Sequence, residues 1–209
     1  MQLREIQKSD WASWDRFYRG NFFNSLSGFK PGILIGTKNL NDINNLALIS
    51  NVVHLGADPA LIGYVNRPRA ATPHTLSNIE QSGVYTMNLI HPGILQAAHQ
   101  SSAKYAEDQS EFEYTELTPA FRAGCSAPFV AESFVQWHMT CVEIVPITHN
   151  NTFLIIGSIE AVYLPNDWVE EDGFIRLEQG ETICTLGLDG YYLPQRIERL
   201  PYARPPRLG

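Results

Sequence analysis

Short apolar segments rich in β-branched residues recur at close intervals, and this spacing constrains the fold more than any other feature of the chain. Residues 32–37 (GILIGT) and 46–50 (LALIS) flank an Asn/Asp-rich turn, a pattern typical of a β-hairpin. Further strands are predicted at residues 61–65, 134–145, 152–164 and 182–186, and the two long ones are expected to pair across residues 149–151. A doubly wound parallel sheet needs strands and helices to alternate strictly, which this chain does not do. The sequence therefore predicts a mainly β protein with flanking helices, built on an antiparallel barrel.

Three helices are expected beside this sheet. Ser9 suits the N-cap of an amphipathic helix over residues 10–22, whose aromatic side chains at helical spacing are expected to form a packing face: Trp11, Trp14, Tyr18 and Phe22. Thr72 as N-cap and Pro73 at the first helical position predict a short helix that stops at Gly83. Residues 94–106 predict a further helix, and residues 107–128 are expected to be rich in loops.

Size and composition favour one domain over residues 1–209, with an N-terminal helical segment at 1–28 and a C-terminal arm at 193–209. Hydrophobic residues make up 44% of the chain, so a packed core is expected. The formal net charge of -7 argues against a nucleic-acid partner, because nucleic-acid phosphates require a cationic face. No segment approaches the ~18 consecutive apolar residues of a membrane span, and we expect no membrane association and a cytoplasmic location.

Several kinds of site are not expected. Cys125, Cys141 and Cys184 have no C-x-x-C spacing, which argues against a disulfide framework or a zinc cage. The six histidines also lack a compact ligand spacing, so no metal site is predicted. Ser126 lies in GCSAPF, which lacks the G-x-S-x-G elbow of many serine hydrolases.

The strongest local candidate for a site is a phosphate-binding segment. Neither G-x-G-x-x-G nor G-x-x-x-x-G-K-[ST] occurs in the chain, so a bound nucleotide would have to be held in another way. Arg67 and Arg69 lie shortly before the predicted helix start, where His74 and Thr75 follow. A helix start presents unsatisfied N–H donors and a partial positive charge, and guanidinium groups donate fork-shaped hydrogen bonds to phosphate oxygens. An acidic protein could hold a phosphate group at this segment.

The order of these segments resembles the flavin reductase-like family, the FMN-binding split-barrel proteins that include flavoredoxin. The matching segments are GILIGT, NNLALISNVVHLGADPALIGYVNRP, HTLSNIEQSGVYTMNLI, NTFLIIGSIEAVYL and GLDGYY, which together span roughly residues 29–192. The resemblance implies one flavin reductase-like domain with an antiparallel Greek-key split β-barrel of the FMN-binding type. It also implies a homodimer with the flavin near the subunit interface. The C-terminal arm could pack on the partner subunit or be a frayed terminus.

The resemblance also implies where a flavin would bind. The loop from Asn45 to Val52 corresponds to the segment that lies along the flavin ring, with Ser50 and Asn51 as polar contacts. The phosphate region of the family corresponds to the arginine segment and helix start described above, and Lys104 falls where relatives place a residue near the flavin. The implied cofactor-binding residues are Asn45, Ser50, Asn51, Val52, Arg67, Arg69, His74, Thr75 and Lys104.

The function that the resemblance favours is that of an FMN-dependent oxidoreductase, specifically an NAD(P)H:flavin reductase. FMN would be the cofactor and NAD(P)H the co-substrate, and no side chain is identified as a catalytic acid or base. Many relatives carry an Asp-His pair just before the strand FLIIG, where this chain has Asn151-Thr152. This departure keeps open a non-catalytic flavin-binding protein, acting as an electron carrier, flavin store or redox sensor. An FMN enzyme with another organic substrate would use the same scaffold.

Overall fold

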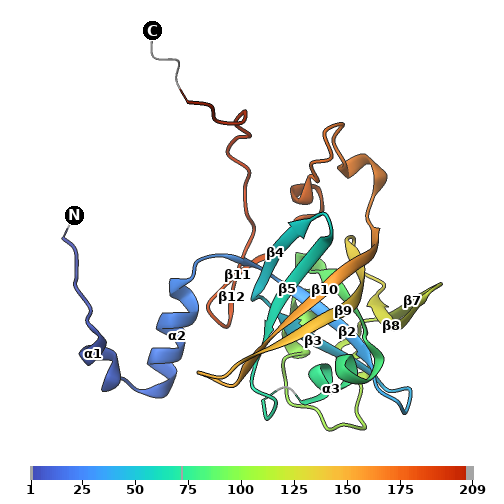
Figure 1. The fold of residues 1–209 in the computed structure, drawn as a ribbon, viewed down its shortest axis with the longest axis horizontal. Coiled ribbons are helices and arrows are strands. Elements are labelled where there is room, and N and C mark those ends of the chain that lie inside the picture. The colour runs from blue at the N-terminus through green and yellow to red at the C-terminus, as the bar shows by residue number, and fades with distance from the viewer. Residues whose placement is uncertain (1, 72, 206–209) are drawn as a thin grey trace.

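The computed structural model describes residues 2–71 and 73–205 (Figure 1). Its centre is a seven-stranded sheet whose strands lie in the order β3-β2-β6-β9-β10-β5-β4. In chain order these strands are β2 (Ile33–Lys38), β3 (Asn44–Ile49), β4 (Val52–Ala57), β5 (Ala60–Asn66), β6 (Val84–Leu89), β9 (Gln136–Ile147) and β10 (Thr152–Tyr163). All neighbouring strands run antiparallel, which confirms the predicted fold class of a mainly β chain built on an antiparallel split barrel.

The barrel is split between two strands that follow each other in the sequence. Strands β3 and β4 form the opposite edges of the seven-stranded sheet and do not pair with each other. Only residues 50 and 51 separate the end of β3 from the start of β4. Three Cα steps of about 3.8 Å span at most roughly 11 Å, so the two edges must meet here. The sheet therefore curls round on itself and stays open along this seam.

Both predicted hairpins are confirmed. Strands β2 and β3 pair with Ile35 opposite Ala47, across the Asn/Asp-rich turn. Strands β9 and β10 pair from Thr152 opposite Ile147 along most of their lengths, with two irregularities in register that add to the curvature of the sheet. The predicted strand at the C-terminal end is also present, as β11 (Cys184–Leu186), which pairs with β12 (Gly190–Tyr192).

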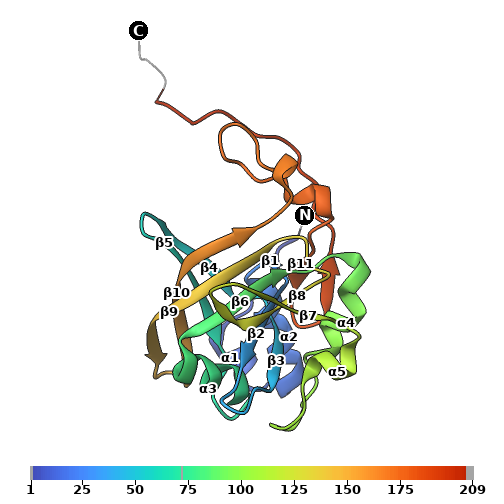
Figure 2. The same ribbon diagram turned by 90° about the vertical axis from the view of Figure 1, so that its right-hand side faces the viewer.

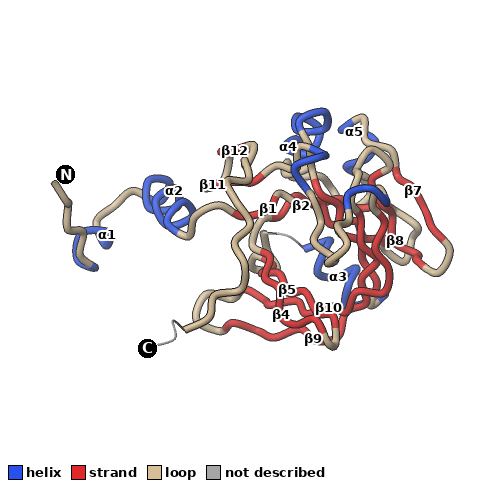
Figure 3. Tube along the Cα trace, turned by 90° about the horizontal axis from the view of Figure 1, so that it is seen from above, coloured by secondary structure: helices blue, strands red, loops and turns tan. Residues whose placement is uncertain are grey.

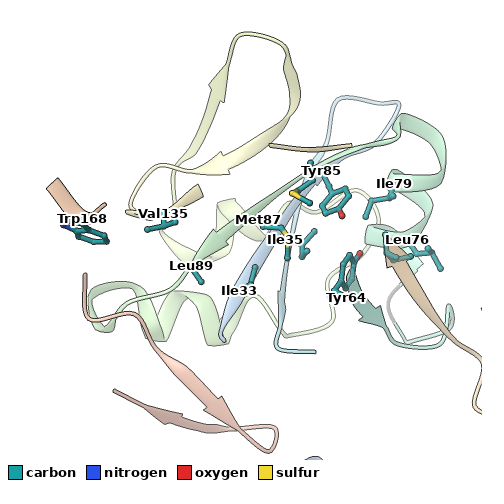
Figure 4. Close-up of a cluster of buried hydrophobic side chains, with 12 residues drawn as sticks. Ile33, Ile35, Tyr64, Leu76, Ile79, Tyr85, Met87, Leu89, Val135 and Trp168 are labelled. Atoms are coloured by element: carbon teal, nitrogen blue, oxygen red, sulfur yellow. The ribbon is translucent and has the colours of Figure 1, made fainter. Parts of the chain in front are cut away.

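The main core fills the inside of the barrel (Figure 4). Apolar side chains from alternate positions of the strands point toward one another there, and Tyr64 and Tyr85 lie against each other with ring centroids 6.1 Å apart. Leu76 and Ile79 of the helix α3 (Pro73–Ser82) close one end of this cluster. Burying a side chain of this size contributes roughly 1.5–3 kcal/mol, so this helix is fixed to the barrel by its apolar face.

The remaining elements lie around the barrel (Figure 2). Helix α3 packs against β2 and β3, and α5 (Glu111–Thr115) packs against β3. The other short elements are β1 (Lys30–Pro31), β7 (Pro119–Arg122), β8 (Cys125–Val130), α4 (Leu95–Gln100) and the 3-10 helices η1 (Pro92–Ile94), η2 (Asn166–Trp168) and η3 (Leu177–Gly180). Within the described residues, no helix has both the length and the apolar character that crossing a membrane requires.

The single N-terminal helix predicted over residues 10–22 is wrong. The structure has two helices instead, α1 (Lys8–Ala12) and α2 (Arg16–Leu26), and Ser9 lies inside the first. Asp15 divides them because its carboxylate accepts hydrogen bonds from the backbone N–H groups of Phe17 at 2.8 Å and Tyr18 at 3.3 Å. This N-cap geometry requires a non-helical backbone at the capping residue, so one helix ends before Asp15 and another begins after it.

The expected packing face of this segment also differs in the structure. The aromatic rings pack against one another, with the centroid of Trp14 4.9 Å from Tyr18 and 5.0 Å from Phe22. Neither helix contributes a buried residue. Figures 1 and 3 show both helices standing to one side of the barrel. The stripe therefore forms an aromatic cluster on an arm, and it does not pack onto the barrel of its own chain.

The prediction for residues 94–128 is wrong in two places. The helix expected over residues 94–106 ends at Gln100. Ser101 is its C-cap, and the Ser101 hydroxyl donates a hydrogen bond to the Ala98 carbonyl at 2.7 Å. The segment expected to be loop-rich contains α5 and the hairpin of β7 and β8. Pro128 makes β8 look unlike a strand, since proline has no N–H to donate to a sheet. The strand tolerates it because β8 pairs on one side only, with β7.

Candidate functional site

The predicted ring-contact loop lies at the seam of the barrel. Ser50 and Val52 are half-buried and Asn51 is exposed. The loop is held by two backbone hydrogen bonds: Val52 donates its N–H to the Ser50 carbonyl at 3.0 Å, and Val65 donates its N–H to the Asn51 carbonyl at 2.9 Å. The second bond ties the loop to the end of β5, one residue before Asn66. The structure thus brings the predicted ring-contact loop close to the start of the predicted phosphate segment.

Arg67 follows directly after β5 and is exposed. The side-chain amide of Asn66, which is buried, donates a hydrogen bond to the Arg67 carbonyl at 2.8 Å and so holds the backbone at this point. Within residues 2–71 and 73–205, no carboxylate forms an ion pair with Arg67. A guanidinium with this freedom, beside the seam, could pair with an external anion.

Arg69 is placed differently, because it already has an acidic partner. Its guanidinium donates two hydrogen bonds to the carboxylate of Glu80 on α3, at 2.8 and 2.5 Å, and lies 5.6 Å from the centre of the Phe153 ring. The hydrogen bond from Arg69 lowers the pKa of Glu80 below its usual value. Arg69 therefore faces the same region as α3, with much of its charge already compensated.

Helix α3 positions His74 and Thr75, the other two residues of the predicted phosphate region. Its predicted N-cap, Thr72, lies outside the described residues. His74 is half-buried, whereas Thr75 is buried, and the Thr75 hydroxyl oxygen accepts a hydrogen bond from the side-chain amide of Asn45 at 3.1 Å. The structure thus brings two predicted site residues, Asn45 and Thr75, into direct contact. The Thr75 hydroxyl takes part in an internal network.

This internal network includes two residues that the sequence analysis did not identify. The Thr37 hydroxyl accepts from Asn45 at 3.2 Å and from Asn78 at 3.0 Å, and all three side chains are buried. The network joins β2, β3 and α3. Because buried polar groups are costly unless they are hydrogen-bonded, it fixes the start of α3 relative to the sheet.

A pocket of about 420 Å³ opens beside this network. Its walls come from the Asn-rich turn, from one face of α3 and from the loop before α5: Asn39, Leu40, Asn41, Ile43, Asn45, His74, Ser77, Asn78, Gln81, Glu107 and Gln109. On α3 the polar lining residues recur at intervals of three and four, which is the spacing of one helical face. That polar stripe was the signal in the sequence that could have revealed this wall. Lys104 is exposed in the same loop as Glu107 and Gln109 but does not line the pocket.

Glu111 is a third residue that was not identified from the sequence. Its side chain is buried, and its carboxylate accepts a hydrogen bond from the backbone N–H of Leu46 in β3 at 2.8 Å. Burial raises the pKa of Glu111 above its usual value, and the hydrogen bond from the Leu46 N–H acts in the opposite direction. The contact joins residues that are 65 positions apart. No local pattern in the sequence signals such a contact.

Comparisons with known proteins agree with the fold. Residues 27–181 match the domain described as "Flavin reductase like domain". No curated protein matches the chain. A protein from Shewanella frigidimarina NCIMB 400, described as a flavin reductase with a split-barrel domain, shares 42% sequence identity and superposes with a TM-score of 0.93; the match covers 96% of this chain and 100% of that one.

Two more distant structures share the fold. Nitrilotriacetate monooxygenase component B from Bacillus cereus is 18% identical with a TM-score of 0.84, over 96% of this chain and 100% of that one. Flavoredoxin of Desulfovibrio vulgaris (Miyazaki F) is 18% identical with a TM-score of 0.72, over 84% of this chain and 92% of that one. The domain match extends over most of the chain and agrees with the fold and with the close structural relative. The chain therefore belongs to the flavin reductase-like family.

Proposed function

We propose that this flavin-related oxidoreductase binds FMN and reduces it with NAD(P)H. The observation that carries the proposal is the seam of the barrel, where the loop of Ser50, Asn51 and Val52 lies next to Arg67. The loop offers main-chain groups to the edge of a flat ring, and Arg67 has no carboxylate partner among the described residues. A ring with an anionic tail fits that combination.

FMN, when bound, supplies the redox chemistry by accepting a hydride. The residues of this chain have the task of binding and orienting it. Arg67, Arg69 and the start of α3 would hold the phosphate, and Ser50 to Val52 would hold the ring. Asn45 and Thr75 would support the site without touching FMN, because their hydrogen bond fixes the position of α3, which carries His74. None of these groups needs to transfer a proton, so no residue is assigned as a catalytic acid or base.

Anaerobic reduction tests this function. Protein loaded with FMN is expected to be yellow and to lose its visible absorbance when NADH or NADPH is added. It is also expected to oxidise NAD(P)H continuously when free flavin is supplied as the acceptor. Protein that cannot take up FMN, under conditions where its fold is intact by circular dichroism, would contradict the proposal.

A non-catalytic flavin-binding protein is the second candidate, and the turn between β9 and β10 favours it. Asn151 occupies this turn with a φ of 58°, and the Thr152 hydroxyl donates a hydrogen bond to the Asn150 side chain at 2.7 Å. These polar groups are engaged within the turn, where many relatives carry an Asp-His pair. Full occupancy by FMN, together with no oxidation of either nicotinamide, would decide for an electron carrier, store or sensor.

We also propose that the chain forms a homodimer, in which a second copy covers the N-terminal helices α1 and α2. Phe17 and Leu26 of α2 have 75% and 68% of their surface exposed. Apolar surface of this extent on one helix is costly in water. The C-terminal arm is a less suitable contact, since Arg196 and Arg199 pair with Glu170 of the same chain.

Light scattering tests the dimer. The protein is expected to have twice the chain mass of 23.5 kDa. Changing Phe17 and Leu26 to serine together is expected to weaken association at least about 10-fold, because two apolar side chains lose their burial. Tyr202→Ser, which removes an exposed ring near the other end of the chain, is the matched control. A monomeric wild-type protein, or a dimer that the double variant leaves intact, would contradict this assignment.

A further inference from the structure

A second pocket lies at one end of the β9–β10 hairpin, where Tyr163 pairs with Gln136. The proposed flavin-binding residues lie near the other end, where Phe153 pairs with Asn66. The second pocket has a volume of about 570 Å³ and is bounded by the β7–β8 hairpin, the end of β10 and η2. Its lining residues are Arg122, Ser133, Phe134, Gln136, Val162, Tyr163, Leu164, Pro165, Asn166 and Val169. One cation and no carboxylate occur in this lining. In a chain with a net charge of -7, such a site stands out.

Arg122 is held in this pocket by a neutral group. Its Nε and Nη2 atoms donate to the amide oxygen of Gln136 at 3.3 and 2.7 Å. The guanidinium carbon lies 4.1 Å from the centre of the Tyr163 ring and 5.4 Å from that of Phe129. Among the residues that the structure describes, no acidic side chain pairs with Arg122. Arg69, Arg196 and Arg199 differ from it, because each has a carboxylate partner.

The orientation of Gln136 is itself determined by its surroundings. Only 2% of its surface is exposed. Its amide nitrogen donates to the carbonyls of Val130 at 2.6 Å and Ser133 at 3.1 Å. Two carbonyl acceptors can be satisfied only by the NH₂ group, so the amide oxygen must face Arg122. The buried amide therefore positions the guanidinium before any ligand arrives.

The arrangement leaves part of the guanidinium available. A guanidinium has five N–H donors, and the Gln136 oxygen occupies donors on the edge formed by Nε and Nη2. The edge formed by Nη1 and Nη2 retains the spacing that binds a carboxylate through two parallel hydrogen bonds. A fixed guanidinium loses little entropy when it forms these bonds, which favours binding.

Apolar side chains form much of the rest of the pocket. Val162, Leu164, Pro165 and Val169 line it together with the ring of Phe134. An inorganic anion would leave these groups in contact with water, whereas a ligand with an apolar body would cover them. We propose that this pocket binds a small organic carboxylate, with its carboxylate group on Arg122 and its apolar body against these side chains.

This site is separate from the proposed flavin phosphate site. Arg69 lies on the ring of Phe153 and Arg122 lies on the ring of Tyr163. Both rings belong to β10, ten residues apart. At about 3.3 Å per strand residue, this separation is roughly 30 Å. The proposed carboxylate site therefore does not depend on the proposed function.

Calorimetric titration of the full-length protein with benzoate tests the proposal. Benzoate is expected to bind saturably, and its neutral counterpart benzamide is not. Inorganic phosphate is expected to bind more weakly than benzoate, because it has no apolar body. Arg122→Gln is expected to raise the dissociation constant for benzoate about 10- to 100-fold, the usual effect of losing charge-assisted hydrogen bonds.

A second variant separates loss of binding from loss of fold. Asn166 is exposed on the pocket wall, and Asn166→Asp changes its charge without changing its shape. This variant is expected to weaken benzoate binding by charge repulsion. Asn41→Asp makes the same change in the Asn-rich turn and is expected to leave benzoate binding unaltered. Failure of benzoate to bind through the millimolar range would overturn the proposal, as would unchanged affinity in Arg122→Gln or phosphate binding as tightly as benzoate.

Discussion

Gly36→Ala is expected to lower the free energy of unfolding by about 3 kcal/mol, the upper end of the usual cost of overpacking a core. Gly36 lies in β2 between Leu46 of β3 and Thr86 of β6. A methyl group added there would overlap the backbone carbonyl of Pro128 and come within 2.5 Å of the Thr86 hydroxyl oxygen. The Thr86 hydroxyl donates to that same carbonyl at 2.6 Å. Neither group can move without breaking this buried hydrogen bond.

Chemical denaturation of the alanine variant measures this effect, and Gly20→Ala is its matched control. Gly20 lies in α2, and a methyl group added there meets no atom within 4 Å. Alanine is favoured over glycine in a helix by up to about 1 kcal/mol, so the control is expected to be neutral or slightly more stable. A loss below about 1 kcal/mol for Gly36→Ala would mean that β8 can withdraw from the barrel at little cost.

Local patterns predicted the parts of the fold that local interactions determine. The β2–β3 and β9–β10 hairpins join strands that are adjacent in the sequence, so strand patterns on either side of a turn were sufficient. Helix α3 begins at the predicted proline and ends before the predicted glycine. The division between α1 and α2 was missed because the aromatic spacing continues through Asp15, although the carboxylate of that residue caps a new helix.

Contacts between distant segments account for the rest. The hairpin of β7 and β8 depends on packing against β2 and β6, and Pro128 concealed its strand character. The two segments of the candidate flavin site were found in the sequence, but their proximity depends on the pairing of β4 with β5, which places Val52 opposite Tyr64. Thr75 was proposed as a phosphate contact because of its place at a helix start. Its burial against Asn45 became visible only when β3 and α3 were in place.

Arg67→Ala is expected to weaken FMN binding about 10- to 100-fold and to leave riboflavin binding unchanged. Riboflavin has the same ring as FMN but no phosphate, so comparing the two ligands isolates the contribution of the anionic tail. Loss of charge-assisted hydrogen bonds to phosphate accounts for the size of the effect. Fluorescence quenching of each flavin measures both dissociation constants. Arg19→Ala, on the exposed face of α2, is the matched control for the loss of one positive charge.

The pair of Arg69 and Glu80 provides a test in which FMN binding is expected to become stronger instead of weaker. The Glu80 carboxylate holds the Arg69 guanidinium through two hydrogen bonds, so it competes with any phosphate for the same donors. Glu80→Gln removes that negative charge and is expected to strengthen FMN binding, again with no change for riboflavin. Both effects are expected to shrink as salt screens the charges. Equal losses of FMN and riboflavin in Arg67→Ala would instead mean that Arg67 supports the loop and not the phosphate. Weaker FMN binding in Glu80→Gln would mean that Arg69 must be fixed by Glu80 to be useful.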